Sequence, residues 1–315
     1  MSSRLTEISH ACFGYGLAVK QRYNLRDKLL GFLVCARPIF LILTPLNAAS
    51  AAVLALGGFP SLTQCLLGFV TVALASAAVN SFNGYVDHER DKLIWQTRPI
   101  PSGRIRPNEA FIMVAFFFLT SLVMSWFVFN PATFAILFVA VVLGGLYSAY
   151  LRDRVGYFSL PPIVGLIYLG GWSAFSPETL FTSLLPWYLY LLGFVWQAAH
   201  IMVLYPVHIP DNARPAPELP PAFFFTPSPR TAVVIGTVFT GLTLLMSALL
   251  PLKAPVGTLY LILVLVAGIY ALVSSASLVK DPLNREKILK AFAVLSVFRL
   301  TISVAILLTI LLTST

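Results

Sequence analysis

The chain has 315 residues, of which 58% are hydrophobic and 10% are charged, and its formal net charge is +9. Soluble globular chains carry about 25% charged residues, so this composition excludes an ordinary soluble domain and indicates a polytopic membrane protein. The basic residues are spread over several connectors and no DNA- or RNA-binding motif accompanies them. We therefore expect membrane lipid, and no nucleic acid, as the partner of this positive charge.

The N-terminal segment does not have the pattern of a secretory signal peptide. Residues 1–28 carry several charges and lack an apolar run followed by small residues at a cleavage site. We expect residues 1–33 to form a cytoplasmic N-terminal arm and residues 34–315 to form one transmembrane domain. Cys12, Cys35 and Cys65 form no CxxC pair, and we interpret them as packing residues.

The apolar segments predict an all-α integral membrane protein with nine transmembrane helices. A helix needs about 20 apolar residues to cross the hydrocarbon core of a bilayer. The fifth segment is short and begins with two prolines, so an irregular helix is possible there. The nine segments lie at 34–57, 62–86, 110–129, 132–150, 160–176, 184–207, 231–250, 256–277 and 291–313.

Lysine and arginine alternate between the connectors of these nine helices. They occur in the N-terminal arm and in the connectors after helices 2, 4, 6 and 8, whereas the connectors after helices 1, 3 and 5 have none and the connector after helix 7 has only Lys253. The positive-inside rule therefore places the N-terminus in the cytoplasm and the C-terminus on the opposite side. Most acidic residues also fall on the cytoplasmic side, which topology alone does not explain.

A stripe of polar residues closes the second segment. Asn83, Asp87 and Asp91 recur every four residues in the sequence NSFNGYVDHERD, and Asn80 lies one turn deeper. Residues four apart share one face of a helix. Carboxylate and amide oxygens on one face suit a hard cation such as Mg²⁺, which also binds phosphate oxygens. A solvated helix end is the alternative, but such an end has no need of amides on the apolar side of its charges.

The next connector adds arginines around a Pro-Ser-Gly turn. The sequence TRPIPSGRIRP at 97–107 places Arg98, Arg104 and Arg106 close to the stripe. Arginine binds phosphate oxygens bidentately, although the same residues could instead contact lipid headgroups. The stripe and the arginines together indicate a diphosphate bound with magnesium.

These motifs resemble the UbiA superfamily of intramembrane prenyltransferases. The stripe matches the first Asp-rich motif of that family, RPIPSGRI is a common continuation, and ARPIFLILTPLNAASAAVLAL at 36–56 is similar to its first helix. LYSAYLRD at 146–153 also resembles the exit of its fourth helix. The resemblance implies a UbiA-type bundle with a cytoplasmic active-site mouth. It also implies that an isoprenoid diphosphate ionises with Mg²⁺ and that its prenyl group passes to an aromatic or lipid acceptor.

The resemblance assigns roles to particular residues of this chain. We expect Asp87, Asp91, Asp211 and His208 to be catalytic, and the metal ligands to be Asn83, Asp87, Asp91 and Asp211. The expected diphosphate-binding residues are Arg37, Arg98, Arg104, Tyr147 and Ser148, and the expected substrate-pocket residues are Asn47, Asn80, Gln197 and His200.

The second acidic motif departs from the family pattern. In YPVHIPDNARPAPELPP at 205–221, only Asp211 stands at a family acidic position, His208 and Pro215 replace aspartates, and Glu218 is out of register. His208 could bind metal, donate to diphosphate or act as a base. The number of Mg²⁺ ions therefore stays open.

Two alternatives to prenyl transfer follow from the same residues. One is a UbiA-type terpene cyclase, in which the double bonds of the substrate quench the cation and no acceptor is needed. The other is a membrane protein without catalysis, either a transporter or a family member that has lost activity. The polar residues cluster at one membrane face, which argues against a midplane transport site, and an inactive member would not be expected to keep Asn83, Asp87 and Asp91 together with Arg98. Arg299, about a third of the way into the last segment, either has a buried partner or extends to the interface.

Overall fold

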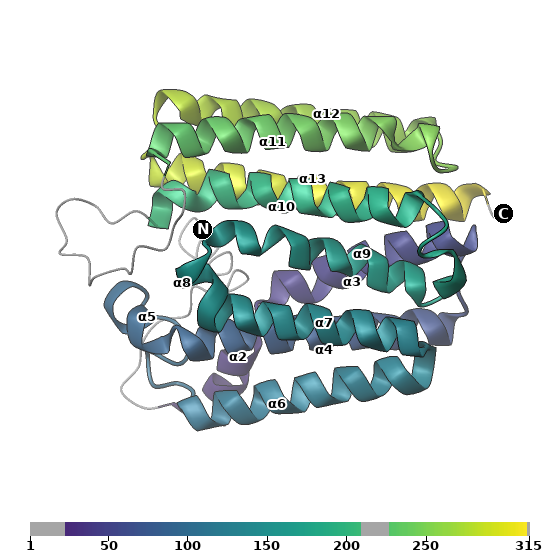
Figure 1. Cartoon of the computed structure of the whole chain (residues 1–315). Helices are drawn as coiled ribbons and strands as arrows, with labels where there is room; N and C mark the ends of the chain where they lie inside the picture. Colours follow the sequence, from purple (N-terminus) through teal and green to yellow (C-terminus); the bar gives the residue numbers. More distant parts are fainter. Residues whose placement is uncertain (1–22, 209–226, 314–315) are drawn as a thin grey trace. The chain divides into compact units, whose positions relative to one another are not determined.

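A computed structural model describes residues 23–208 and 227–313, and within these ranges the chain is helical with no strand (Figure 1). Eight of the described helices are long and apolar enough to cross a membrane. They are α3 (Pro38–Leu56), α4 (Leu62–Val86), α6 (Pro107–Met124) continued by η1 (Ser125–Phe129), α7 (Pro131–Leu146) continued by η2 (Tyr147–Leu151), α10 (Leu185–His208), α11 (Pro229–Leu249) continued by η5 (Leu250–Leu252), α12 (Thr258–Ser277) continued by η6 (Leu278–Lys280), and α13 (Arg285–Thr313).

The predicted count of nine spans is not confirmed, because the fifth segment forms a shorter helix. This helix, α9, runs from Pro161 to Ser173 and has 13 residues. At 1.5 Å per residue it is about 20 Å long, which is less than the roughly 30 Å hydrocarbon core. Its two N-terminal prolines favour a helix start at that point, and the short 3₁₀ turns η3 (Tyr157–Ser159) and η4 (Pro177–Thr179) lie on either side.

The other boundaries follow the predicted segments, with two informative differences. The first span begins at Pro38 rather than at residue 34, because the chain leaves helical geometry at Arg37. The last helix begins at Arg285 rather than at residue 291. Asn284 caps it by accepting a hydrogen bond from the Lys287 backbone at 3.1 Å, so its charged first turns extend the helix beyond the apolar segment.

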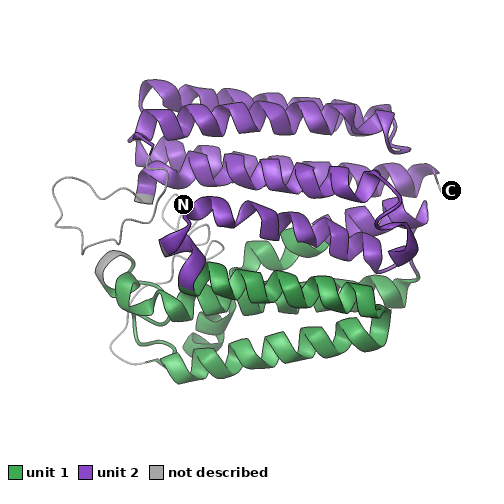
Figure 2. Ribbon diagram, in the orientation of Figure 1, with its two compact units in different colours: residues 1–45, 61–149 green, residues 46–60, 150–315 purple. Residues whose placement is uncertain are grey.

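The chain divides into two compact units, which Figure 2 colours separately. Unit 1 comprises residues 1–45 and 61–149. In this unit α4 packs against α6 and α7, and two helices outside the predicted spans, α2 (Leu25–Cys35) and α5 (His88–Ile94), pack against α4. The helix α2 occupies the end of the expected N-terminal arm, of which residues 1–22 lie outside the described ranges.

Unit 2 comprises residues 46–60 and 150–315. In it α9 packs on α10, α10 packs on α11 and α13, and α12 packs on both α11 and α13. Its short helix α8 (Arg152–Arg154) precedes η3. The backbones of α9 and the second half of α3 approach closely at Gly171, where an added Cβ would collide with the carbonyl oxygen of Ala48. Small residues allow such close approach between membrane helices.

We predict that Gly171→Ala lowers the thermal midpoint of the detergent-solubilised protein by several degrees. The added methyl group meets backbone atoms that cannot rotate away, and such overpacking costs about 1–3 kcal/mol. Gly241→Ala is the matched control, because its Cβ would lie 3.7 Å from the Leu272 side chain, which is ordinary contact. Equal midpoints for the two variants would show that α3 and α9 do not pack at Gly171.

Candidate functional site

The helical hydrogen-bond pattern continues through the end of α4 into α5. The Asp87 backbone donates to the Asn83 carbonyl at 3.0 Å, and the Asp91 backbone donates to the Asp87 carbonyl at 2.8 Å. The three residues therefore keep the four-residue spacing on one side of the chain, as the sequence predicts. Asp87 is 8% exposed and Asp91 is 3% exposed, so this is not a solvated helix end.

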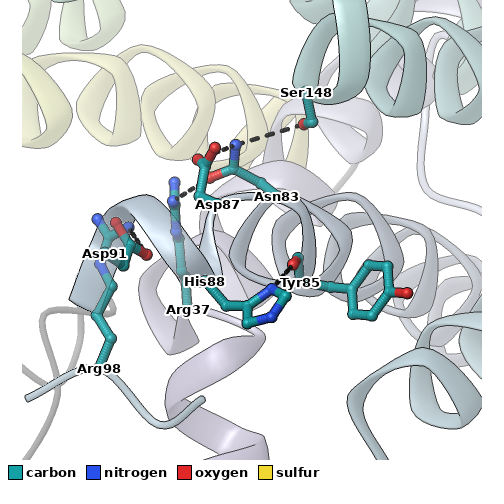
Figure 3. A network of polar contacts seen from close by, with 8 residues as sticks. All are labelled: Arg37, Asn83, Tyr85, Asp87, His88, Asp91, Arg98 and Ser148. Atoms are coloured by element: carbon teal, nitrogen blue, oxygen red, sulfur yellow. Dashed lines mark hydrogen bonds and ion pairs between the residues drawn. The ribbon is translucent and has the colours of Figure 1, made fainter. Parts of the chain in front are cut away.

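Asn83 is the centre of a network of polar contacts in unit 1 (Figure 3). Its side-chain oxygen accepts a hydrogen bond from Arg37 Nη2 at 2.7 Å. Its amide nitrogen donates to Asp87 Oδ2 at 3.2 Å and lies 3.4 Å from the Ser148 hydroxyl. The network thus joins the residues between α2 and α3, the end of α4, and the π-helical turn η2 that follows α7.

Arg37 reaches this network from a strained backbone. Its φ of 54° makes it the only non-glycine residue with positive φ in the described part of the chain. Left-handed geometry is unfavourable for side chains with a Cβ, and such strain is concentrated at functional sites. Pro38 follows Arg37 and disfavours the ordinary α conformation at that position. The kink ends α2 and points the guanidinium at Asn83.

Asp91 forms a buried ion pair with Arg98. Arg98 Nη1 donates to Asp91 Oδ2 at 2.7 Å, and the two side chains are 14% and 5% exposed. Burial raises the pKa of the Asp91 carboxyl above its ordinary value, and the Arg98 guanidinium opposes this shift. Arg98 also lies over the Trp95 ring, with 5.5 Å from Cζ to the ring centroid.

The connector that carries Arg98 has a defined conformation. The Gly103 backbone donates to the Ile100 carbonyl at 3.0 Å, which closes a turn, and Gly103 has a φ of 74°. Ile100 and Ile105 are buried in an apolar cluster with Cys35 and Met113. Turn geometry and burial together hold the arginine-bearing connector against α2 and α6.

A pocket of about 290 Å³, measured with its open mouth, lies beside the ion pair in unit 1. Burial raises the pKa of the Cys35 thiol to about 12, so this wall of the pocket offers a neutral thiol and no thiolate nucleophile. The residues that line the pocket are Val34, Cys35, Arg37, Asn80, Gly84, Asp91, Arg98, Pro99, Ile100 and Pro101.

The structure brings together most of the unit 1 residues that the sequence singles out. Asn80 lines the pocket and donates to the Ser76 carbonyl at 2.9 Å. Tyr147 and Ser148 are both buried in η2. Arg104 is an exception, because its side chain packs against Gly31 of α2 and lies over the Tyr23 ring, and it does not line the pocket.

Asn47 is one of the substrate-pocket residues predicted in unit 2. Asn47 is fully buried, and its side-chain oxygen accepts hydrogen bonds from the Tyr168 hydroxyl at 2.9 Å and from the Ser303 hydroxyl at 2.8 Å. Asn47 therefore joins α3, α9 and α13. Sequence reasoning missed Tyr168 and Ser303, although each is a polar residue inside an apolar segment, and this is the signal that could have identified them.

His200 and Gln197 are both buried on α10. The His200 ring stacks on Trp196, with centroids 4.5 Å apart, and lies 3.9 Å from the Phe292 centroid. Arg299 lies 4.4 Å above the Trp196 ring and is 4% exposed. Of the two interpretations of Arg299, extension to the membrane interface is therefore wrong.

The second acidic motif lies largely outside the described residues. Asp211 falls in the range that the structure does not describe, and only the backbone of His208 is described, at the end of α10. Within the described ranges no group of three or more His, Cys, Asp or Glu side chains could hold a metal ion. The described carboxylates of the site are those of Asp87 and Asp91.

Comparison with known proteins identifies the family. Residues 43–309 match the model of the UbiA prenyltransferase family. The chain is 28% identical over 269 residues to the digeranylgeranylglyceryl phosphate synthase of Thermococcus kodakarensis, covering 84% of this chain and 92% of that protein. It is also 28% identical over 285 residues to the protoheme IX farnesyltransferase of Salinispora tropica, covering 86% and 85% of the two chains.

A solved structure supports the fold. A UbiA homolog from Archaeoglobus fulgidus bound to DMAPP and Mg²⁺ superposes with a TM-score of 0.60 at 19% sequence identity, covering 87% of this chain and 98% of that one. The family match extends over most of the sequence and includes the stripe, the arginine-bearing connector and most of α13. This chain therefore belongs to the UbiA prenyltransferase family.

Proposed function

We propose that this chain is an Mg²⁺-dependent prenyltransferase that binds an isoprenoid diphosphate at the end of α4 and passes its prenyl group to an aromatic or lipid acceptor. The observation that carries the proposal is a network of buried polar contacts beside one pocket. Asp91 pairs with Arg98, and both line the pocket. Arg37 also lines the pocket, and Asn83 joins it to the buried carboxylate of Asp87. Buried acids and arginines in such close contact match a ligand that brings both negative charge and a metal.

The donor set fits magnesium that arrives with its substrate. Mg²⁺ is usually held by one or two carboxylates together with water and substrate phosphates. Asp87 and Asp91 provide two carboxylates at helical spacing, and Asn83 provides an amide oxygen that already accepts from Arg37. We propose these three residues as metal ligands and Asp211 as a further one. The structure of a UbiA homolog bound to DMAPP and Mg²⁺ supports magnesium as the metal.

The arginines and hydroxyls bind the diphosphate itself. Arg37 and Arg98 line the pocket, and both can donate paired N–H groups to phosphate oxygens. In the structure Asn83 accepts one hydrogen bond from Arg37, and Asp91 accepts one from Arg98. When bound, Mg²⁺ neutralises charge that develops on the leaving diphosphate. Tyr147, Ser148 and Arg104 are proposed as further diphosphate contacts, and His208 as a metal ligand, donor or base.

The acceptor is proposed from the relatives and from the polar residues of unit 2. One relative is named protoheme IX farnesyltransferase and the other digeranylgeranylglyceryl phosphate synthase, and neither name favours the cyclase alternative. Asn47, Gln197 and His200 are buried polar residues within apolar helices. Such residues are costly and usually functional, so we keep them as acceptor-pocket candidates, together with Asn80 of unit 1.

We also propose the membrane topology that the sequence predicts, with nine membrane elements. We infer that α9 is the fifth of nine membrane elements, with its flanking 3₁₀ turns extending a helix too short to cross alone. With nine elements, the alternation of Lys and Arg places the N-terminus and the mouth of the site in the cytoplasm, and the C-terminus on the opposite side.

We predict that Asp87→Asn and Asp91→Asn each reduce prenyl transfer by roughly 100-fold or more, the scale seen when one transition-state contact is removed. Each variant removes a carboxylate charge from the proposed metal site and leaves the shape of the side chain nearly unchanged. Glu89→Gln is the matched control on the same short helix, because Glu89 is 67% exposed and pairs with Lys92 at the surface. The control is expected to keep wild-type turnover.

The assay measures diphosphate release and prenylated product with geranyl, farnesyl or geranylgeranyl diphosphate, with and without an acceptor. Turnover that requires an acceptor and Mg²⁺ supports prenyl transfer. A cyclic hydrocarbon formed from the donor alone would instead establish the cyclase. Full activity in both aspartate variants would refute the assignment of the site.

We predict that Arg37→Gly and Arg37→Ala both lose prenyl transfer but differ in stability. Both variants lose the hydrogen bond to Asn83, whereas only glycine tolerates the φ of 54° without strain. The glycine variant should be more stable than the alanine variant by about 1 kcal/mol. Thermal denaturation of the two purified variants tests this difference, and a more stable alanine variant would show that Arg37 does not hold a left-handed backbone.

A further inference from the structure

Arg299 is a buried charge with unmet hydrogen-bonding capacity. It lies near the middle of the 29-residue helix α13 and is 4% exposed. Its Nε and Nη2 atoms have no hydrogen-bond partner among the described residues, and no described carboxylate pairs with it. Buried polar groups are nearly always satisfied, and charges inside a membrane segment usually have a partner. Two open donors on one buried guanidinium therefore require an explanation.

Two aromatic rings contact the Arg299 guanidinium, and neither carries a negative charge that would neutralise it. Arg299 Cζ lies 4.4 Å from the Trp196 ring centroid and 5.9 Å from that of Tyr168. Trp196 is fixed by a hydrogen bond from its indole nitrogen to the Leu295 carbonyl at 2.9 Å. Cation–π contacts attract a guanidinium through the faces of the rings, and they leave the in-plane N–H groups available for a planar oxyanion.

His200 adds a second unmet polar atom in the same cluster. Its ring stacks on Trp196 at 4.5 Å and lies tilted against Phe292 of α13 at 3.9 Å, and its Nδ1 has no partner among the described residues. In the tautomer that protonates Nδ1, this atom is a donor. The neighbouring Asn47 oxygen, by contrast, is satisfied by Tyr168 and Ser303. Within this cluster the unmet polar atoms belong to Arg299 and His200, and all of the cluster residues belong to unit 2.

We propose that Arg299 and His200 form an oxyanion-binding subsite inside unit 2, which receives the acid group of an acceptor substrate with an apolar or aromatic body. The guanidinium binds the oxyanion through Nε and Nη2, and His200 donates from Nδ1. The rings of Trp196, Tyr168 and Phe292 contact the apolar part of the ligand. That this ligand is the acceptor rests on the proposed prenyl transfer, whereas the anion subsite itself rests only on the contacts above.

The shared chemistry of the ligand is a carboxylate or phosphate attached to an apolar body. An aromatic acid would supply a carboxylate, and an acidic lipid would supply a phosphate. Both provide two oxygens for the side-on N–H pair of arginine. A neutral molecule of the same shape would leave the donors of Arg299 unmet, so charge is the property that the subsite selects.

The first test is a thermal-shift measurement on the purified full-length chain in detergent. The probes are benzoate against benzamide, and dodecyl phosphate against dodecanol. We expect one or both acidic probes to raise the midpoint of the wild type more than the neutral analogue does, and to have no such effect on Arg299→Met. A response to benzoate alone assigns an aromatic acid, and a response to dodecyl phosphate alone assigns an acidic lipid.

Two further variants separate binding from structural roles. Without probe, Arg299→Met should be at least as stable as the wild type, because an unpaired buried charge is replaced by an apolar side chain. Thr309→Val is the matched control, since Thr309 is also buried on α13 with an unpartnered hydroxyl but does not belong to the cluster. This control should keep the full response to the acidic probes.

The proposal is overturned if acidic and neutral probes shift the wild type equally, or if Arg299→Met responds to the acidic probes as the wild type does. It is also overturned if Arg299→Met is markedly less stable than the wild type without probe, which would indicate a structural cation. The Asp87→Asn variant separates this proposal from the proposed function. It should keep the anion response even though it loses turnover.

Kinetics test the link to the acceptor. In Arg299→Met the KM for an acidic acceptor should rise by on the order of 10- to 100-fold, the scale of a lost charge-assisted hydrogen bond, while the KM for the prenyl diphosphate stays unchanged. Equal rises in both KM values would overturn the assignment of the subsite to the acceptor.

Discussion

The free-energy cost of burying charge in apolar surroundings is the constraint on which both polar sites of this chain depend. A charged side chain inside a membrane protein is usually paired with an opposite charge, hydrogen-bonded, or part of a binding or catalytic site. In unit 1 the buried Asp91 pairs with Arg98 at 2.7 Å, and Arg37 donates a hydrogen bond to the neutral Asn83 side chain at the same distance. These contacts make it possible for carboxylates and arginines to lie together at the end of an otherwise apolar helix.

The same contacts organise the backbone around the pocket. Arg37 reaches Asn83 only because the chain turns through a left-handed residue between α2 and α3. Arg98 reaches Asp91 because the following connector is fixed by a glycine turn and by buried Ile100 and Ile105. The site therefore combines segments far apart in the sequence. The left-handed backbone at Arg37 and the glycine turn of the connector each place one arginine in the polar network. In unit 2, Nε and Nη2 of Arg299 have no hydrogen-bond partner among the described residues.

Much of this arrangement could be predicted from the sequence, because it depends on short-range spacing. Residues four apart share a helix face, so Asn83, Asp87 and Asp91 could be grouped directly, and apolar runs located eight of the spans. The fifth of the nine predicted spans is not confirmed, because hydropathy does not measure where a proline-initiated helix ends and α9 has only 13 residues. The burial of Arg299 and the displacement of Arg104 toward α2 could not be predicted, because both depend on packing between helices distant in sequence.

The central claim is that the Asn83 network binds a diphosphate together with magnesium. Isothermal titration calorimetry with geranyl thiodiphosphate, an analogue that ionises poorly, measures this binding without turnover. We predict binding to the wild type that requires Mg²⁺, and a loss of at least about tenfold in affinity, near 1.4 kcal/mol, in Asn83→Leu. Equal affinity with and without Mg²⁺, or unchanged affinity in Asn83→Leu, would contradict the account.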